Sequence, residues 1–227
     1  MRISDHRYNR DRLRFDLAIR MMRHHARTST IRAWTALSED RIRKLYKAYL
    51  LQRPSGAQVR RRGKAPRQAV YFLQTAALCF EATTLAALLH AARLVPLADE
   101  PARPLLPEGA ALITLDRAQR FCAAYETYIR LCPAGRLSFE HAWFLATSLV
   151  LRDGIQLIRC TLCGRLYLAE AGCQMAPSCG CGRRQIGWPR RGRLPLSLIN
   201  AYDGGHAMVR GRGARRAALQ SCAASAA

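Results

Sequence analysis

The stretch LIRCTLCGRLYLAEAGCQMAPSCGCGRR, residues 157–184, holds five of the chain's nine cysteines at spacings typical of metal ligands. Cys160 and Cys163 form a C-x-x-C pair, and this spacing lets two thiolates of one tight turn face the same tetrahedral ion. Cys179 and Cys181 form a second group among glycines. The spacing predicts a metal site that joins the two groups.

The residues around the C-x-x-C pair predict a small ribbon. Ile155 and Leu157 precede the pair and the run 166–168 follows it, so two short strands can leave the turn as a hairpin. Gly164 is placed where the turn needs a residue that adopts positive φ. Four thiolates leave no open coordination position, so we expect a zinc-binding ribbon over residues 155–184 with one structural zinc ion per chain.

The second cysteine group leaves the ligand set open. It reads C-x-C where a standard knuckle reads C-x-x-C, and Cys173 lies between the two groups as a substitute for Cys179 or Cys181. A set of reduced or redox-active thiols is the alternative interpretation. The neighbouring glycines, and the lack of a thioredoxin-like strand and helix pattern, favour a metal site over it.

Length and composition indicate a globular protein. A chain of 227 residues, half of them hydrophobic, has room for one sizeable core or for a core and a small module. The N-terminus is charged and lacks the apolar segment of a signal peptide, and polar residues interrupt the longest apolar stretch, residues 69–95. We therefore expect a cytoplasmic protein without a membrane span, in which cysteines bind metal rather than form disulfides.

Positive charge is concentrated at the two ends of the chain, whose net charge is +22. Residues 1–62 carry 17 basic and 5 acidic side chains, residues 63–150 carry 8 and 7, and residues 151–227 carry 12 and 3. Two basic surfaces on a neutral body suit a protein that neutralises the phosphates of nucleic acid. Solubility or a membrane-surface patch is the alternative, and the size of the surplus favours nucleic acid.

The N-terminal region, residues 1–52, is predicted to be basic, helical and helix-turn-helix-like. Apolar spacing predicts a first helix over residues 8–27. His24 and His25 at its end are expected to be surface residues or to face the helix dipole, rather than to be ligands, because no acid or paired cysteine lies nearby in the sequence.

Two further helices are expected in this region, capped by Thr30 and Ser38. The helix after Ser38 has one apolar and one basic face, as a helix that reads the major groove requires. A solvated surface without DNA contact is the alternative. The predicted DNA contacts on this helix are Arg41, Arg43, Lys44 and Lys47.

The remaining chain divides into a loop, a helical core and a tail. Residues 53–67 read as a basic loop, in which Arg60, Arg61 and Arg62 are predicted to contact phosphates. A solvated linker without such contacts is the alternative. Residues 68–154 read as the helical core, and residues 185–227 as a basic tail that we expect to be flexible. The helices expected in the core cover residues 68–94, Thr114 to about Leu131, and a helix capped by Ser138 that Asp153 and Gly154 terminate.

Three stretches in this order resemble the FlhC family, the bacterial flagellar master transcriptional activator subunit. They are LSEDRIRKLYKAY (37–49), YETYIRLCP (125–133) before a tryptophan-containing helix, and GIQLIRCTLCGRLYL (154–168), within a similarity that covers residues 13–185. The resemblance implies a mainly helical protein that binds zinc through four cysteines. It also implies assembly with FlhD-type subunits, binding to flagellar promoter DNA and recruitment of RNA polymerase.

The resemblance also bears on the ligand set and the tail. Zinc sites of the family have a second C-x-x-C, which Cys179 and Cys181 match one residue short, whereas Cys160 and Cys163 match the first pair. The basic tail also looks longer than is usual for the family.

Taken together, the sequence predicts a mainly α protein: a helical body with a helix-turn-helix-like N-terminal region and a small C-terminal zinc-ribbon-like module. We expect a DNA-binding activator of flagellar genes and no enzymatic activity or small-molecule substrate. The chain lacks H-x-E, H-E-x-x-H, G-x-x-x-x-G-K and G-x-S-x-G motifs. The alternative is a general RNA- or nucleic-acid-binding zinc protein without promoter specificity, although the sequence lacks an aromatic-rich β platform.

Overall fold

The computed structural model describes residues 5–50, 68–107, 111–172, 179 and 181, and this part of the chain is mainly helical. No helix in these ranges is long and apolar enough to cross a membrane. The elements in chain order are α1 (Asp5–Arg23), α2 (Thr28–Thr35), α3 (Glu39–Leu45), the π-helical turn η1 (Tyr46–Leu50), the 3-10 helix η2 (Ala69–Leu73), α4 (Ala76–Ala91), α5 (Ala111–Leu131), α6 (Phe139–Leu151), β1 (Ile155–Arg159) and β2 (Leu166–Glu170).

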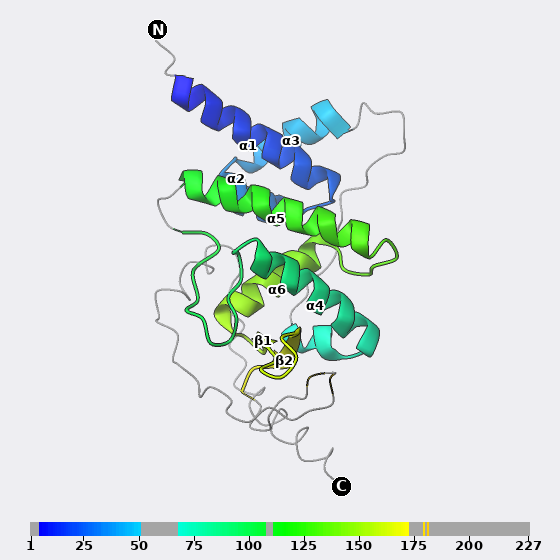
Figure 1. The fold of residues 1–227 in the computed structure, drawn as a ribbon. Helices are drawn as coiled ribbons and strands as arrows, with labels where there is room; N and C mark the ends of the chain where they lie inside the picture. Colours follow the sequence, from blue (N-terminus) through cyan, green and yellow to red (C-terminus); the bar gives the residue numbers. More distant parts are fainter. Residues whose placement is uncertain (1–4, 51–67, 108–110, 173–178, 180, 182–227) are drawn as a thin grey trace, which may run out of the picture.

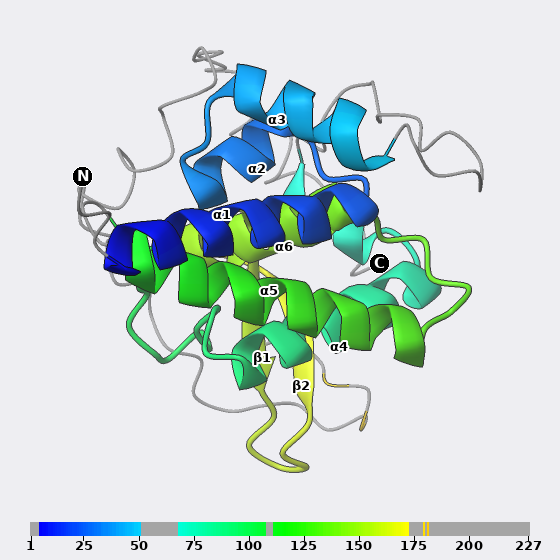
Figure 2. The same ribbon diagram turned by 90° about the horizontal axis from the view of Figure 1, so that it is seen from above.

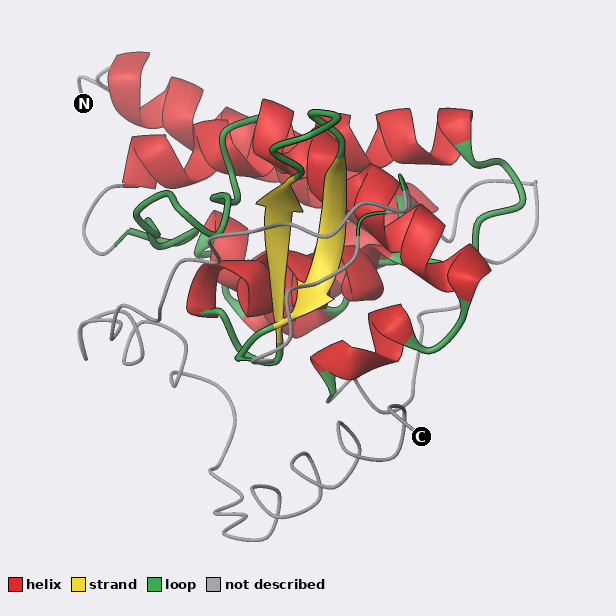
Figure 3. Ribbon diagram, turned by 60° about the horizontal axis from the view of Figure 1, so that its bottom comes forward, coloured by secondary structure: helices red, strands yellow, loops and turns green. Residues whose placement is uncertain are grey.

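The helices are packed in layers around α5. Figure 1 shows α1, α2 and α3 at one end of the molecule and the β1–β2 hairpin at the other, with α5 between them. Figure 2 shows α1 lying alongside α5, and α4 and α6 contact each other and the hairpin strands. The two antiparallel strands lie against this helical body (Figure 3). The predicted mainly helical fold and the predicted hairpin are both confirmed.

A cluster of buried aromatic side chains joins the layers. Trp34 of α2 packs edge-on against Trp143 of α6, with ring centroids 5.1 Å apart. Phe121 of α5 packs in the same way against Phe139 of α6 at 5.2 Å. Aromatic pairs of this geometry add to the free energy gained from burying apolar area. The cluster therefore fixes α2, and with it α3, to the core of the protein.

The short connection between α2 and α3 follows from two local features. Ser38 begins α3 in an extended conformation, and its Oγ accepts a hydrogen bond from the backbone N–H of Arg41 at 3.4 Å, as predicted. Ala36 ends α2 in the left-handed conformation, with φ 55°, and donates its N–H to the carbonyl of Arg32. The three residues between α2 and α3 thus form a tight turn, and Ile42 of α3 joins the same buried core as Trp34 of α2.

Several helix boundaries differ from the prediction. The expected helix over 68–94 is broken, because Thr75 is extended (φ −134°, ψ 150°) and its hydroxyl caps α4 by accepting from the N–H of Leu78. The first helix ends at Arg23 rather than at residue 27, since His25 adopts a left-handed φ of 58° and turns the chain into α2. α5 begins at Ala111, before the expected cap at Thr114.

Thr30 does not cap α2, which begins at Thr28. Its hydroxyl instead donates to the buried carboxylate of Glu140 at 3.0 Å. The same carboxylate accepts from the backbone N–H of Arg27 at 2.7 Å. A buried carboxylate is costly unless such donors satisfy it, so this contact fixes the start of α2 to α6.

The expectation that His24 is a surface residue is wrong, because an acid that is distant in the sequence lies beside it in the fold. Glu126 of α5 lies 2.9 Å from His24 Nε2 and accepts two hydrogen bonds from Arg20, at 2.7 and 2.6 Å. The His24 ring also stacks on Phe139, with ring centroids 5.9 Å apart. The hydrogen bonds from Arg20, followed by those with His24, lower the pKa of Glu126 to about 2 despite partial burial. This network joins α1 to α5.

We expect Ala36→Gly to raise the free energy of unfolding by about 1 kcal/mol, because glycine adopts the left-handed conformation without the strain that a Cβ introduces. The melting temperature measured by circular dichroism should rise by about 3 °C. Ala123→Gly, in the exposed middle of α5, is the control and should lower stability by about 1 kcal/mol. A lower melting temperature for Ala36→Gly would contradict the turn geometry.

Glu126→Gln should lower the free energy of unfolding by roughly 2 kcal/mol at pH 7, after allowance for partial exposure of the pair. The folded-state pKa of Glu126 lies below the ordinary value of 4.5, so its contribution is complete above pH 4.5 and is lost as the pH falls toward 2. Urea unfolding of both proteins between pH 7 and pH 2.5 should therefore show a shrinking difference. Asp99→Asn, at an exposed position, should show no such pH dependence.

Candidate metal centre

The hairpin is fixed to the helical body at its base. α6 ends at Arg152 in the left-handed conformation (φ 53°), and Gly154, with φ 76°, turns the chain into β1. Ile155 and Leu157 are buried in the core, and Leu157 is paired with Leu168 of β2. Burial of one face of the hairpin against the helices therefore determines its register and the direction in which its tip points.

The tip of the hairpin is a tight turn that contains the C-x-x-C pair. The carbonyl of Cys160 accepts from the N–H of Gly164 at 2.9 Å, and the N–H of Cys160 donates to the carbonyl of Arg165 at 2.8 Å. Gly164 has a φ of 72°, and apart from its two chain neighbours no described residue has an atom within 4 Å of the place where a Cβ would stand. Its backbone conformation, and not lack of space, is therefore what favours glycine.

The structure brings together the four cysteines that the spacing predicted. The Sγ atoms of Cys160, Cys163, Cys179 and Cys181 all lie within 4.8 Å of one another. Cys160 and Cys181 are separated by 3.8 Å and Cys163 and Cys179 by 3.6 Å between sulfurs. Cys173, the possible substitute, lies outside the described residues.

These separations fit a tetrahedral metal ion. Metal–sulfur bonds of about 2.3 Å, the length found in zinc–cysteine sites, place the four sulfurs about 3.8 Å apart. A disulfide would need about 2.05 Å between sulfurs, far less than any cysteine pair in the cluster. The four cysteines could therefore hold one metal ion, with every tetrahedral position taken by sulfur. Such a closed site stabilises structure and leaves no position for a reacting water.

Without a metal, the surroundings of Cys179 favour its protonated thiol. A backbone hydrogen bond with Cys181 lowers the pKa of Cys179, but burial and hydrogen bonds with the other thiols outweigh it and raise that pKa to about 12. Burial also raises the pKa of the neighbouring Tyr167 to about 12, and the negative charge of the thiolates adds to the effect. If a metal cation replaced the thiol protons, it would balance the negative charges of the thiolates, which otherwise repel one another. Metal binding and folding of the site would therefore be coupled.

The predicted DNA contacts lie at the opposite end of the molecule from this cluster (Figure 1). Arg41, Arg43, Lys44 and Lys47 are all exposed on α3 and η1. Arg43 forms ion pairs with Glu39 and Asp40, with nitrogen–oxygen distances of 3.3 and 3.0 Å. The guanidinium of Arg41 lies 5.8 Å from the centre of the Phe15 ring. Arg60, Arg61, Arg62, the loop 53–67 and the tail 185–227 lie outside the described residues.

Two exposed arginines flank the C-x-x-C pair. Arg159 ends β1 directly before Cys160, and Arg165 follows Gly164. Their position on either side of the C-x-x-C pair was visible in the sequence. The exposure of both side chains became evident only once the register of the hairpin was known.

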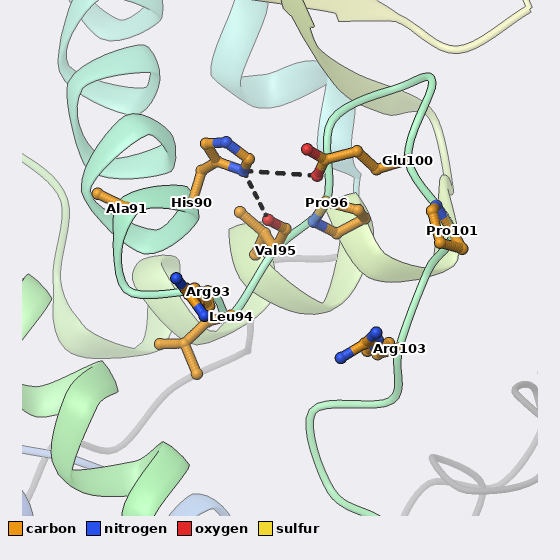
Figure 4. A pocket seen from close by; sticks show the side chains of 9 residues that line it. All are labelled: His90, Ala91, Arg93, Leu94, Val95, Pro96, Glu100, Pro101 and Arg103. Atoms are coloured by element: carbon orange, nitrogen blue, oxygen red, sulfur yellow. Dashed lines mark hydrogen bonds and ion pairs between the residues drawn. The ribbon is translucent and has the colours of Figure 1, made fainter.

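A cavity of about 500 Å³ lies beside the connection that leaves α4 (Figure 4). His90 Nδ1 lies 3.1 Å from the carbonyl oxygen of Val95 and 3.8 Å from the Glu100 carboxylate. These contacts hold the connection against the end of α4, and the described residues that line the cavity include no cysteine, serine or threonine. The arrangement therefore resembles a structural contact more than a nucleophile with its base.

Comparisons with known proteins do not identify a relative. No protein-family model matches the chain, and no curated protein matches it significantly. The function proposed below therefore depends on the geometry of the chain itself and on the three stretches that resemble the FlhC family.

Replacing Cys160 with serine should abolish metal binding, because a serine hydroxyl is a poor substitute for a buried thiolate ligand. The purified wild-type chain should contain one metal ion and the variant none, as measured by plasma mass spectrometry. Unfolding of the hairpin should accompany the loss, since metal binding supplies much of its folding free energy. Cys132→Ser, which changes a cysteine outside the cluster, should keep the full metal content. Retention of one ion by Cys160→Ser would exclude this site.

Proposed function

We propose that this chain is a DNA-binding transcriptional activator of flagellar genes that acts in a hetero-oligomer with FlhD-type subunits. The observation that carries the proposal is the basic face of α3 and η1, held outward by a helix-turn-helix-like pair of helices. The proposal assigns the chain a binding function and no catalytic one.

The geometry of α3 supports DNA contact. Ile42 and Leu45 are buried, so the opposite face of the helix is directed to solvent. Lys44 and Lys47 are exposed there and form no ion pair within the part of the chain that the structure describes. In a helix-turn-helix protein the second helix enters the major groove, where lysine neutralises phosphates and arginine binds guanine. The two lysines are therefore ready to contact phosphates.

Arg41 and Arg43 differ in the contacts that each must give up before it can bind DNA. Arg43 must give up its ion pairs with Glu39 and Asp40 before it contacts DNA. Surface ion pairs of this kind contribute little free energy, so phosphate contact can replace them. Arg41 needs only to leave the Phe15 ring. We assign base or phosphate contact to both, and expect Arg41 to contribute more.

The metal in this proposal is a single structural zinc ion bound by Cys160, Cys163, Cys179 and Cys181. Four sulfur ligands at tetrahedral separations favour zinc over calcium or magnesium, which prefer oxygen ligands. When bound, zinc would supply no chemistry beyond holding the ligands together. The four cysteine side chains would then join the hairpin tip, which contains Cys160 and Cys163, to the segment that contains Cys179 and Cys181.

Exposed apolar side chains support the need for a protein partner. Leu112 and Ile113 at the start of α5 are 65% and 51% exposed, and Tyr8 and Leu13 of α1 are 60% and 41% exposed. The N-terminal parts of α1 and α5 lie at the same end of this helix pair (Figure 2). Apolar side chains gathered on a surface are typical of protein interfaces. An FlhD-type subunit or RNA polymerase would cover this region.

Competition binding tests the proposal. With an FlhD-type partner, the full chain should prefer a flagellar promoter duplex over a scrambled duplex and over RNA by on the order of a thousandfold. Lys44→Ala/Lys47→Ala should reduce the slope of log affinity against log salt by about two, because two phosphate contacts are lost. Arg103→Ala/Arg136→Ala removes two exposed charges elsewhere and is the control. Equal competition by all three nucleic acids would instead indicate a general nucleic-acid-binding protein.

A further inference from the structure

The cavity beside the connection that leaves α4 has a surplus of positive charge. Its lining contains two arginines, Arg93 and Arg103, and one acid, Glu100. That acid is already engaged, because one of its carboxylate oxygens accepts from the N–H of Leu97 at 2.9 Å and lies 3.8 Å from His90 Nδ1. Figure 4 shows the histidine and the acid at one end of the cavity and the two arginines at the other. The arginine end is therefore positive.

The side chains around the cavity select a particular kind of ligand. Arg93 and Arg103 are exposed, and their guanidinium groups have no partner among the residues that the structure describes. A guanidinium presents its N–H donors as a planar fork, and this geometry matches the two oxygens of a carboxylate or a phosphate. Apolar side chains, those of Ala91, Pro96 and Pro101, line the same cavity. The lining thus suits a small molecule that joins an oxyanion to an apolar part.

The wall that carries Arg103 is held in place by the rest of the fold. Arg120 and Arg152 donate to backbone carbonyls of the connection, at 3.2 and 2.6 Å. The N–H of Ala98 donates to the carbonyl of Leu157 in β1 at 2.8 Å. Prolines two residues before Arg103 and directly after it restrict the backbone there. A ligand would therefore meet a site that is already formed.

The turn that carries Arg93 does not need an arginine. Its N–H donates to the carbonyl of His90 at 2.8 Å, and the N–H of Leu94 donates to the carbonyl of Leu89 at 3.0 Å, which is the Schellman pattern that ends a helix. Arg93 has a left-handed φ of 58°, a conformation that glycine adopts with less strain. A glycine at this position would keep the turn and remove the guanidinium, so it separates binding from folding.

We propose that this cavity binds a small organic anion, whose carboxylate or phosphate group is held by Arg93 and Arg103 while its apolar part lies against the proline walls. The cavity volume of about 500 Å³ is in the range of small-molecule sites. The anion is a ligand in this proposal and not a substrate. The site goes beyond the proposed DNA-binding function, since it shares no residue with α3 or with the four cysteines.

Nuclear magnetic resonance titration of the ¹⁵N-labelled full chain tests the proposal. Phenyl phosphate and benzoate are the probes, in about 0.15 M sodium chloride to screen general attraction to the basic surface. The better-fitting probe should shift the backbone amide signals of residues 90–103 in a saturable way, and comparison of the two identifies the preferred acidic group. Neutral benzamide should cause no such shift. Inorganic phosphate should bind more weakly than phenyl phosphate, because it lacks the apolar part.

Variants of the two arginines separate the site from general anion binding. Arg93→Gly/Arg103→Ala should weaken binding of the preferred probe by at least about tenfold, because charge-assisted hydrogen bonds are lost. Its melting temperature should equal or exceed that of the wild type, since glycine suits the turn. Arg103→Ala alone should weaken binding without a change in melting temperature. Arg136→Ala, which removes an exposed charge elsewhere, should bind as the wild type does.

Three results would overturn the proposal. The first is that neither probe shifts residues 90–103 of the wild type. The second is that the shifts spread over α3 and other basic segments and persist in the double variant, which would show general attraction of anions to a basic protein. The third is equal affinity for inorganic phosphate and phenyl phosphate, which would remove the apolar part of the site. Loss of promoter binding would leave this proposal unaffected.

Discussion

Burial of α5 between neighbouring helices is the constraint on which the rest of the structure depends. Phe121, Cys122, Tyr125 and Tyr128 of this helix are buried, and Trp34, Phe139 and Trp143 pack around the same centre. A helix of 21 residues is about 30 Å long, which is enough to contact α1 along one side and α4 along another. The two candidate functional surfaces therefore project from opposite ends of one core. Neither surface has to build a core of its own.

The parts of the fold that were predictable from sequence are those that local chemistry determines. Ser38 and Ser138 cap their helices, as predicted from their position directly before a segment with helical spacing of apolar residues. The predicted hairpin forms around the C-x-x-C pair. Contacts between residues far apart in the chain were not predictable in this way. Glu126 contacts His24, and Glu140 contacts Thr30, only because the helices pack together. A single sequence does not show which helices pack together. The break before α4 was not predicted, because apolar residues continue on both sides of Thr75, which caps this helix.

The sequence allowed prediction of which cysteines form the candidate metal centre, but not of how they are placed relative to one another. The C-x-x-C spacing alone predicted Cys160 and Cys163 as metal ligands, because two thiols of one turn lie close together without help from another element. The convergence of Cys179 and Cys181 on them depends on how the chain returns to the hairpin tip, which spacing does not determine. The C-x-C spacing is nevertheless compatible with sulfur separations of 3.6 and 3.8 Å.

The most direct test of the central claim, that these four cysteines bind one structural zinc ion, is X-ray absorption spectroscopy at the zinc edge on the purified full chain. Four sulfur ligands at about 2.3 Å, with no nitrogen or oxygen ligand, are expected. A site with a bound water or with histidine ligands would contradict the closed cysteine site. A chain that contains no zinc, yet keeps its hairpin folded and binds promoter DNA, would contradict the structural role of the metal altogether.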